Sequence, residues 1–274
     1  MDINRVVFCL NSSPIYSGMW DIVSEVYTRT TDFIPTLIFC GTQEELDQEV
    51  KSDFGEVYRF PRYSEVIQNP NLDWSTVWTL FWAIANKFPN DICLFSGIDE
   101  IPISTVLWER IATYKDDKYI IPLGADPYRA YRQRGLPYYS QRTIATGHNC
   151  GKGSTFKRIF QIENDLQDEL QKVWNDRDRF RQIAIHPTTG SVEWWGIDEA
   201  YAAQFVYNHP DVIFFEEEWV QKYLQGRKID RSVGCSYDIN KLKEKYYWTA
   251  HLVRPLAEPN NMKKTAQLLE DMGI

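Results

Sequence analysis

Arg5-Val-Val-Phe-Cys-Leu10, near the start of the chain, is a short and mostly apolar run. A run in which polar and apolar residues do not strictly alternate is typical of a strand that is buried on both faces of a sheet. Further strand-like runs occupy residues 36–40, 56–60, 91–95, 119–123 and 211–215. Helical patterns separate several of them, notably 19–26, 73–88 and 104–114. This alternation predicts an α/β fold with a mostly parallel central sheet and helices on both faces.

The length of 274 residues suits one large domain, and the chain has no internal repeat or low-complexity tract. We therefore expect one domain over residues 1–255, followed by a linker and a short tail helix over 256–274. Within that domain, residues 1–125 form the strand-and-helix half, and residues 126–255 are less regular. The aromatic and basic segment 126–142 is expected to be a hairpin or an exposed loop, serving as a ligand site or a subunit contact.

Composition limits the classes of function. The net charge of −8 disfavours general nucleic-acid binding, which requires a basic surface. No apolar run approaches the roughly 20 residues of a membrane span, so no transmembrane segment is expected. The five cysteines are scattered, without a CxxC pair. This is typical of buried thiols in a reducing compartment and predicts a soluble, cytoplasmic protein.

An acidic pair directly follows the predicted strand at 91–95, within Ser96-Gly-Ile-Asp-Glu-Ile-Pro102. Carboxylates at the end of a strand lie at the edge of a parallel sheet where ligands bind. Asp99 and Glu100 are therefore candidates to hold Mg²⁺ or Mn²⁺ together with substrate phosphates. The alternative interpretation is that one of them caps the following helix.

A second acidic pair follows two tryptophans, in Glu193-Trp-Trp-Gly-Ile-Asp-Glu199. The rings of Trp194 and Trp195 could hold a sugar face, and Asp198 or Glu199 could take a proton from a hydroxyl group. The alternative is a buried aromatic pair with two acids that favour a helix N-terminus.

The segment Thr146-Gly-His-Asn-Cys-Gly-Lys-Gly153 contains three glycines, which allow a ligand to approach the backbone closely. It does not match a P-loop, because Gly153 follows Lys152 where serine or threonine is required. A simple flexible turn is the alternative. Near the end of the chain, His251 is either a structural residue or a late metal ligand.

Taken in order, these motifs resemble those of the nucleotide-sugar glycosyltransferases of the GT-A fold. In that family, a D-x-D motif holds a metal ion and the donor diphosphate, a glycine-containing loop lines the donor site, and a W-G-G-E-D-like motif supplies the base. Here Asp99 matches the last acid of D-x-D, and residues 195–199 match the base motif. The sequence Gly97-Ile-Asp-Glu-Ile-Pro102 is similar to the DVDEIP motif of the bisecting N-acetylglucosaminyltransferase family.

The chain departs from the family pattern at two positions. Gly97 stands where the first aspartate of D-x-D would be, which puts metal binding in doubt unless Glu100 substitutes. Ile197 stands where the second glycine of the base motif would be, and the two acids after it come in reversed order. The choice of base between Asp198 and Glu199 therefore stays open.

The resemblance implies a hexosyl- or N-acetylhexosaminyl-transferase that moves a sugar from a nucleotide-diphosphate donor to a glycan or another hydroxyl acceptor, with inversion. It implies Mn²⁺ or Mg²⁺ as cofactor, held by Asp99, Glu100 and His251. The expected catalytic pair is Asp198 and Glu199. The candidates for donor binding are Asn11, Ser12, Gly97, Gly147, Arg227 and Lys228. The candidates for acceptor binding are Trp194, Trp195 and His148.

Three other classes remain open. A nucleotidyltransferase would carry a basic residue in the loop after the first strand, and residues 11–18 contain neither lysine nor arginine. A glycosidase could use a carboxylate pair such as Asp99 and Asp198. A protein that binds carbohydrate or nucleotide without catalysis is the third class, and Gly97 is the residue that favours it.

Overall fold

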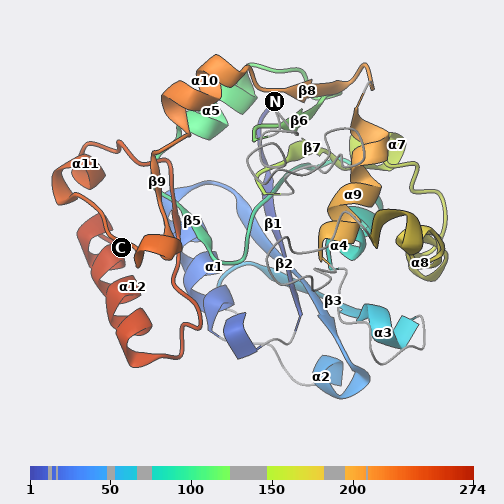
Figure 1. Cartoon of the computed structure of the whole chain (residues 1–274), viewed down its shortest axis with the longest axis horizontal. Coiled ribbons are helices and arrows are strands. Elements are labelled where there is room, and N and C mark those ends of the chain that lie inside the picture. Colours follow the sequence, from blue (N-terminus) through green and yellow to red (C-terminus); the bar gives the residue numbers. More distant parts are fainter. Residues whose placement is uncertain are drawn as a thin grey trace.

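The computed structural model describes residues 1–11, 14–16, 18–47, 53–66, 76–123, 147–181, 195–207 and 209–274, without the side chains of 14, 180, 181 and 195–197. Its centre is a seven-stranded sheet in the order β3-β2-β1-β4-β7-β6-β8 (Figure 1). The strands are β1 (Arg5–Asn11), β2 (Ile34–Gly41), β3 (Glu56–Pro61), β4 (Ile92–Phe95), β6 (Tyr119–Ile121), β7 (Cys150–Lys152) and β8 (Val212–Phe214). Only β7 runs antiparallel to its neighbours. The predicted mostly parallel sheet is confirmed.

A second, three-stranded sheet lies beside the first, in the order β5-β10-β9. It consists of β5 (Glu100–Pro102), β9 (Lys228–Ile229) and β10 (Thr249–His251). The α-helices are α1 (Met19–Thr30), α2 (Gln43–Asp47), α3 (Tyr63–Val66), α4 (Val77–Lys87), α5 (Val106–Ala112), α7 (Gly153–Ile159), α8 (Leu166–Arg181), α9 (Trp195–Val206), α10 (Glu217–Tyr223), α11 (Ile239–Lys243) and α12 (Pro259–Met272). Two 3-10 helices, η1 (Pro14–Tyr16) and η2 (Arg231–Val233), complete the described elements.

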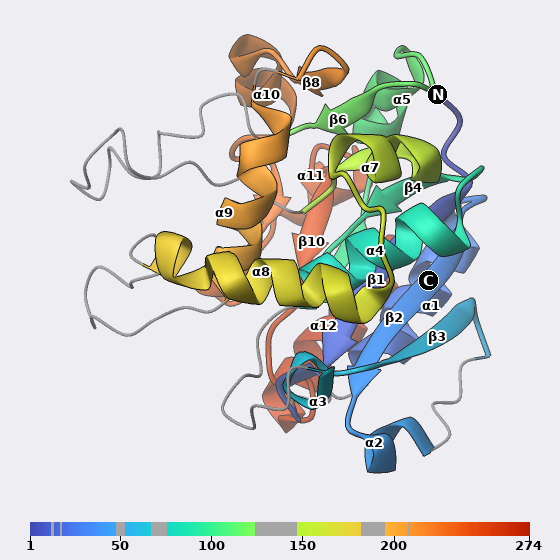
Figure 2. The ribbon, with the colours of Figure 1, turned by 90° about the vertical axis from the view of Figure 1, so that its right-hand side faces the viewer.

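Successive side chains of the central strands enter two different hydrophobic cores, because a strand points alternate residues to opposite faces. Val7 of β1 and Phe95 of β4 enter the core that is covered by α4, α7, α8 and α9. Figure 2 shows α4, α8 and α9 stacked over this face of the sheet. The core contains a group of aromatic rings, with Phe81 stacked on Phe160 at 4.6 Å between ring centroids.

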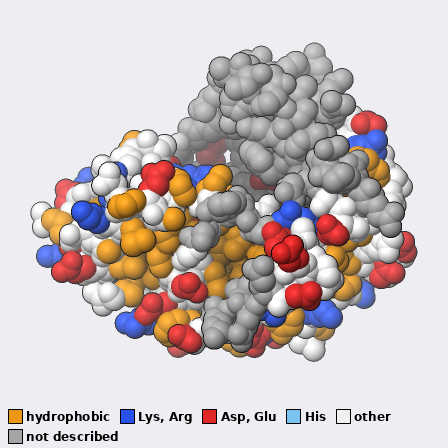
Figure 3. Space-filling model, turned by 90° about the horizontal axis from the view of Figure 1, so that it is seen from below, with side chains coloured by type: hydrophobic (Ala, Val, Ile, Leu, Met, Phe, Trp, Pro, Cys, Tyr) orange, Lys and Arg blue, Asp and Glu red, His pale blue; other side chains and the backbone are white. Residues whose placement is uncertain are grey.

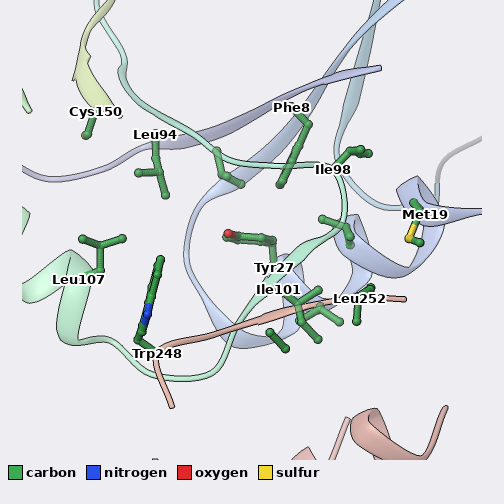
Figure 4. Close-up of a cluster of buried hydrophobic side chains, with 14 of the residues drawn as sticks. Phe8, Met19, Tyr27, Leu94, Ile98, Ile101, Leu107, Cys150, Trp248 and Leu252 are labelled. Carbon is green, nitrogen blue, oxygen red and sulfur yellow. The ribbon is translucent and has the colours of Figure 1, made fainter. Parts of the chain in front are cut away.

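The opposite face of the sheet packs against α1, α5 and the small sheet. Phe8 of β1 and Leu94 of β4 enter this second core. Figure 4 shows Tyr27 of α1 lying between Phe8 and Ile101 of β5. Strong burial on both faces explains why the central strands have no polar alternation in the sequence.

Several local predictions are confirmed. In the sequence, Thr42 and Glu45 have the spacing of a capping box, which predicts the start of a short helix. The structure forms this box in both directions: the Thr42 N–H donates to Glu45 Oε2 at 2.8 Å, and the Glu45 N–H donates to Thr42 Oγ1 at 3.3 Å. The expected helix over 104–114 is α5. All five cysteines are free, and four of them are buried.

Other local predictions were wrong. The charged pattern from Phe156 to about Arg177 predicts a single helix, but the structure has two helices, α7 and α8, separated by a turn in which Gln161 has a positive φ of 52°. The basic stretch 226–231 predicts a loop, but it contains strand β9. Pro255 and Pro259 predict a linker over 255–264, but the chain is already helical from Pro259. A strand of two residues is too short for a period to appear, whereas Pro259 in the first turn of α12 is a helix-start signal that the linker prediction overlooked.

The glycine-rich segment is mostly regular structure. Cys150–Lys152 is strand β7, and α7 begins at Gly153. A Cβ atom at Gly153 would lie 2.1 Å from the carbonyl oxygen of Phe88 and 2.6 Å from that of Ile84. Gly153 therefore lets α7 approach the end of α4 closely, which is a packing role.

No helix in the described part of the chain is long and apolar enough to cross a membrane.

Candidate functional site

The order of the central sheet reverses between β1 and β4. From β1 the chain moves outward through β2 to β3, whereas β4 lies on the other side of β1. Helix α1, between β1 and β2, covers one face, and α4, between β3 and β4, covers the other, while β1 and β4 pair in parallel. In open α/β sheets, ligands bind outside the carboxyl ends of the strands at such a switch point. Asn11 ends β1 there, and the segment that contains Gly97 and Asp99 follows β4.

The chain leaves the central sheet after Ser96, whose N–H donates to the carbonyl of Val7 at 3.1 Å. A turn follows, in which the Glu100 N–H donates to the carbonyl of Gly97 at 3.0 Å. Strand β5 then begins and pairs antiparallel with β10. Gly97 lies tightly against the acids: a Cβ atom there would lie 3.2 Å from Asp99 Oδ1 and 3.3 Å from Glu100 Oε2.

The register of the small sheet decides which side chains reach this turn. Glu100 is opposite His251, and Lys228 is opposite Thr249, so Glu100, His251 and Lys228 project from the same face. The intervening Ile101, Ala250 and Ile229 point the other way and are fully buried in the core. Packing of these three apolar residues therefore fixes the charged face.

Asp99 is the centre of a charged cluster. Arg231 of η2 donates to Asp99 Oδ2, His251 Nε2 lies 3.1 Å from the same oxygen, and Arg254 Nε lies 3.3 Å from it. The orientation of η2 is set by Asp230, whose carboxylate accepts the Ser232 N–H at 2.7 Å. Three segments of the chain thus converge on one carboxylate.

Glu100 holds the second half of the cluster. Lys228 donates to Glu100 Oε1, and Nδ1 of His148 lies 3.4 Å from Oε2. His148 is buried, with its ring edge-on to Trp248 at 4.7 Å between centroids. Burial lowers the pKa of His148 more than the Glu100 charge raises it, so this ring is neutral at pH 7. His148 therefore contacts Glu100 from the buried side of the cluster.

Tyr16 and Cys9 extend the cluster along the strand ends. The guanidinium of Arg254 lies over the Tyr16 ring at 4.9 Å and donates to its hydroxyl. Burial raises the pKa of Cys9 to about 11, against a hydrogen bond to Thr76, and the carboxylate of Asp198 raises it further. Asp198, in the first turn of α9, is fully buried. The same edge of the sheet therefore carries both acids that the sequence singles out, Asp99 and Asp198.

Both acids of the cluster are anionic at neutral pH. Burial raises the pKa of Asp99, but the hydrogen bond and charge of His251, together with Arg231 and Arg254, outweigh it, so the pKa lies below its ordinary 3.8. Burial likewise raises the pKa of Glu100, and its interactions with His148, Lys228 and His251 bring the pKa below its ordinary 4.5. The folded chain therefore binds these two protons less readily than the unfolded chain does.

A pH dependence of stability follows. The contribution of Asp99 and Glu100 is complete above about pH 5 and is lost as pH falls through their folded pKa values, because protons then bind the unfolded chain preferentially. We expect the double variant Asp99→Asn, Glu100→Gln to unfold more easily at pH 7 and to show a flatter loss of stability between about pH 5 and pH 3. Urea unfolding at each pH measures this, with Asp32→Asn, an exposed acid after α1, as the control. An unchanged slope would contradict the assignment.

The structure brings together six of the predicted site residues: Gly97, Asp99, Glu100, His148, Lys228 and His251. Gly147 also adjoins them, since a Cβ atom there would lie 3.8 Å from Glu100 Oε2. Arg227 points elsewhere, with its guanidinium 4.5 Å from the ring centroid of Tyr246. Glu199 is partly exposed in α9. Ser12, Trp194 and the side chain of Trp195 lie outside the described residues, as does segment 126–142.

Sequence reasoning missed Arg231, Arg254 and Tyr16. Each lies in a short or irregular segment, where no periodicity or motif distinguishes a site residue from a surface residue. The only signal was indirect: Arg231 belongs to the basic stretch that includes Lys228, and Arg254 follows His251 by three positions.

The present side chains do not suit a divalent cation. Asp99 and Glu100 are already paired with Arg231, Arg254 and Lys228, and a metal ion needs carboxylate oxygens that are open to it. In the described part of the chain, no group of three or more His, Cys, Asp or Glu residues could hold a metal ion. Mn²⁺ or Mg²⁺ binding by Asp99, Glu100 and His251 therefore stays a prediction of the sequence, and no step below uses it.

Two hollows of about 450 and 430 Å³ lie elsewhere, at the end of α1 and the start of α5, and both are lined by Thr30, Thr31, Thr105 and Trp108. The strands β1 to β3 run downward in Figure 1, so Figure 3 views their carboxyl edge. Acidic and basic side chains are interspersed with hydrophobic ones on that face. The described part of this face therefore carries both signs of charge, despite the acidic total.

No family model matches the chain, and no curated protein matches its sequence. Similar solved structures include the galactosyltransferase LgtC in complex with donor and acceptor sugar analogs, 11% identical with a TM-score of 0.48, covering 98% of this chain and 95% of that one. An active-site mutant of LgtC is 12% identical with a TM-score of 0.49, covering 97% and 95%. The glycosyltransferase GlyE of Streptococcus pneumoniae TIGR4 is 10% identical with a TM-score of 0.47, covering 98% of this chain and 62% of that one. Likeness this distant does not transfer an activity.

Proposed function

We propose that this chain is a glycosyltransferase that moves a sugar from a nucleoside-diphosphate sugar to an acceptor hydroxyl. The observation that carries the proposal is the cluster of Lys228, Arg231 and Arg254 on two buried acids, at the switch point of an open α/β sheet. A diphosphate ester carries the charge that such a cluster attracts, and the switch point is where nucleotides bind in sheets of this kind.

The residues have distinct roles in the proposed reaction. Lys228, Arg231 and Arg254 bind the donor diphosphate and stabilise the negative charge that develops on it as the bond to the sugar breaks. Asn11, at the end of β1, lies on the nucleotide side of the switch point. Asp198 accepts the proton of the acceptor hydroxyl, whose oxygen then forms the new bond to the anomeric carbon. Attack on the face opposite to the leaving diphosphate inverts the anomeric configuration.

The chemical class of the donor follows the resemblance described above: a hexose or an N-acetylhexosamine. The acceptor is a glycan or another hydroxyl compound. The family resemblance to GT-A glycosyltransferases supports this choice over hydrolysis. So does the cationic cluster, because a glycosidase needs two carboxylates on either side of a sugar and has no use for a diphosphate site.

Ligand-induced stabilisation tests the proposal. Uridine, guanosine, cytidine and adenosine diphosphates and their sugar conjugates are added one at a time, and thermal unfolding is followed. We expect one nucleotide to raise the melting temperature, since a ligand at 100 times its Kd stabilises a fold by about 2.7 kcal/mol. Transfer of the matching sugar to a panel of glycans is then assayed. If no nucleotide shifts the transition, the proposal is overturned; stabilisation without transfer to any acceptor favours a binding protein.

A further inference from the structure

In the charged cluster, the acidic and the basic side chains differ in their exposure to solvent. The side chains of Asp99 and Glu100 are only 8% and 9% exposed, whereas those of Lys228, Arg231 and Arg254 are 26%, 29% and 25% exposed. The acids therefore lie beneath and the bases lie toward solvent. An incoming anion meets the positive layer first, and a cation would have to displace that layer to reach a carboxylate.

The balance of charge points the same way. Among these five side chains, three basic groups face two carboxylates, which leaves one net positive charge. A divalent cation would raise this to three positive charges in a partly buried space, where like charges repel more strongly than in water. The cluster therefore attracts a diphosphate and repels a free divalent cation.

Gly97 and His148 fit this arrangement. Gly97 contributes no third carboxylate, and atoms of both acids occupy the space around it at 3.2 to 3.3 Å from where its Cβ would lie. His148 offers its Nδ1 atom to Glu100 at 3.4 Å and is buried beneath it, away from solvent. Asp99 and His251 are close to each other, but Arg231 contacts both of them. The guanidinium group thus already contacts the polar atoms of Asp99 and His251 that would hold a metal ion.

We propose that Lys228, Arg231 and Arg254 take the place of the divalent cation, so that the chain binds a nucleoside diphosphate without metal. Asp99 and Glu100 are then positioning residues that hold the basic groups in place. This inference rests on the proposed function, because it concerns the donor of the same reaction. It departs from the sequence prediction, in which the two acids are metal ligands.

Calorimetric titration of the full chain separates the two roles. The probes are the uridine, guanosine, cytidine and adenosine diphosphates, each titrated once with EDTA and once with MnCl₂. We expect the Kd of the bound nucleotide to agree within about threefold between the two conditions and to rise with salt, because the basic groups are partly exposed. A Kd that requires Mn²⁺ overturns the inference and leaves the proposed function standing. Absence of binding in both conditions overturns both.

Single substitutions test which side chains bind the nucleoside diphosphate. Arg231→Met and Lys228→Met should each raise the Kd about tenfold or more in EDTA, as expected for loss of a hydrogen bond between charged groups. Asp99→Asn should raise it less, by a similar factor with and without MnCl₂. Arg158→Met, which removes an arginine paired with Asp211 before β8, is the matched control and should leave the Kd unchanged. Circular dichroism verifies that each variant is folded. If Asp99→Asn abolishes only the binding seen with MnCl₂, Asp99 is a metal ligand and the inference fails.

MnCl₂ titrated alone gives a readout that does not depend on nucleotide or activity. Electron paramagnetic resonance of free Mn²⁺ should show no uptake by the wild-type chain at concentrations up to about 1 mM, well above the Kd of a typical carboxylate-rich site. Stoichiometric uptake that Asp99→Asn removes would overturn the inference.

Discussion

Replacing Asp198 with asparagine is expected to lower the rate of sugar transfer by about 100- to 10,000-fold, the range by which a positioned general base accelerates a reaction. Asparagine has the same shape but cannot accept the proton of the acceptor hydroxyl. Binding of the nucleoside diphosphate should be unchanged, because the basic cluster that holds it lies on other segments. A transfer assay at saturating donor, together with calorimetry of donor binding, measures both effects.

Glu199→Gln is the matched control, because it removes the neighbouring acid of the same motif from a partly exposed position in α9. It should retain near-wild-type transfer. Asp198 is buried close enough to Cys9 and Cys40 to raise the pKa of both thiols, although burial is the larger cause for each. If Asp198→Asn keeps its transfer rate but lowers the melting temperature, Asp198 is a buried structural acid and not the base.

Gly153→Ala is expected to destabilise the fold by roughly 3 kcal/mol, at the upper end of what overpacking costs. The added methyl group would lie 2.1 Å from a backbone oxygen of Phe88 and 2.6 Å from that of Ile84, and neither can turn aside as a side chain would. Helix α7 must therefore move away from the end of α4. Phe156 of α7 would move with it, away from its ring contact with Phe81 at 5.5 Å.

Gly147→Ala is the control for this substitution. It adds the same methyl group in the same segment, but the nearest atom is Glu100 Oε2 at 3.8 Å, an ordinary contact. Chemical unfolding of both variants compares the two free energies. Equal losses would show that the close approach of α7 to α4 does not determine the stability of this region.

Strands β1, β2, β4 and β6 were predictable because they are mostly buried on both faces, whereas β7 lies in the glycine-rich segment and was not predicted as a strand. The runs Arg5–Leu10 and residues 91–95 each contain four or more consecutive apolar residues. Such continuous apolar runs are typical of strands that are buried on both faces. The capping box at Thr42 was predictable for a local reason, since its hydrogen bonds join residues only three apart. In both cases the physical cause lies within the segment itself.

The small sheet was not predictable in this way. Its strands have two or three residues each, which is too short for a period to appear. Arg231 and Arg254 become site residues only because β9 and β10 of the small sheet bring them beside Asp99, which is more than 130 positions earlier in the chain. The acids were found from their position after a strand, whereas Arg231 and Arg254 required the tertiary structure.

Strand β10 inserts between β5 and β9, and Arg254 contacts Tyr16, which lies 238 positions before it. This connectivity has a consequence for synthesis on the ribosome, where the chain emerges from its N-terminus. A nascent chain that has released residues through β8 has every strand of the large sheet but none of the three basic groups. The proposed donor site is therefore completed only after the strands of the large sheet have been synthesised.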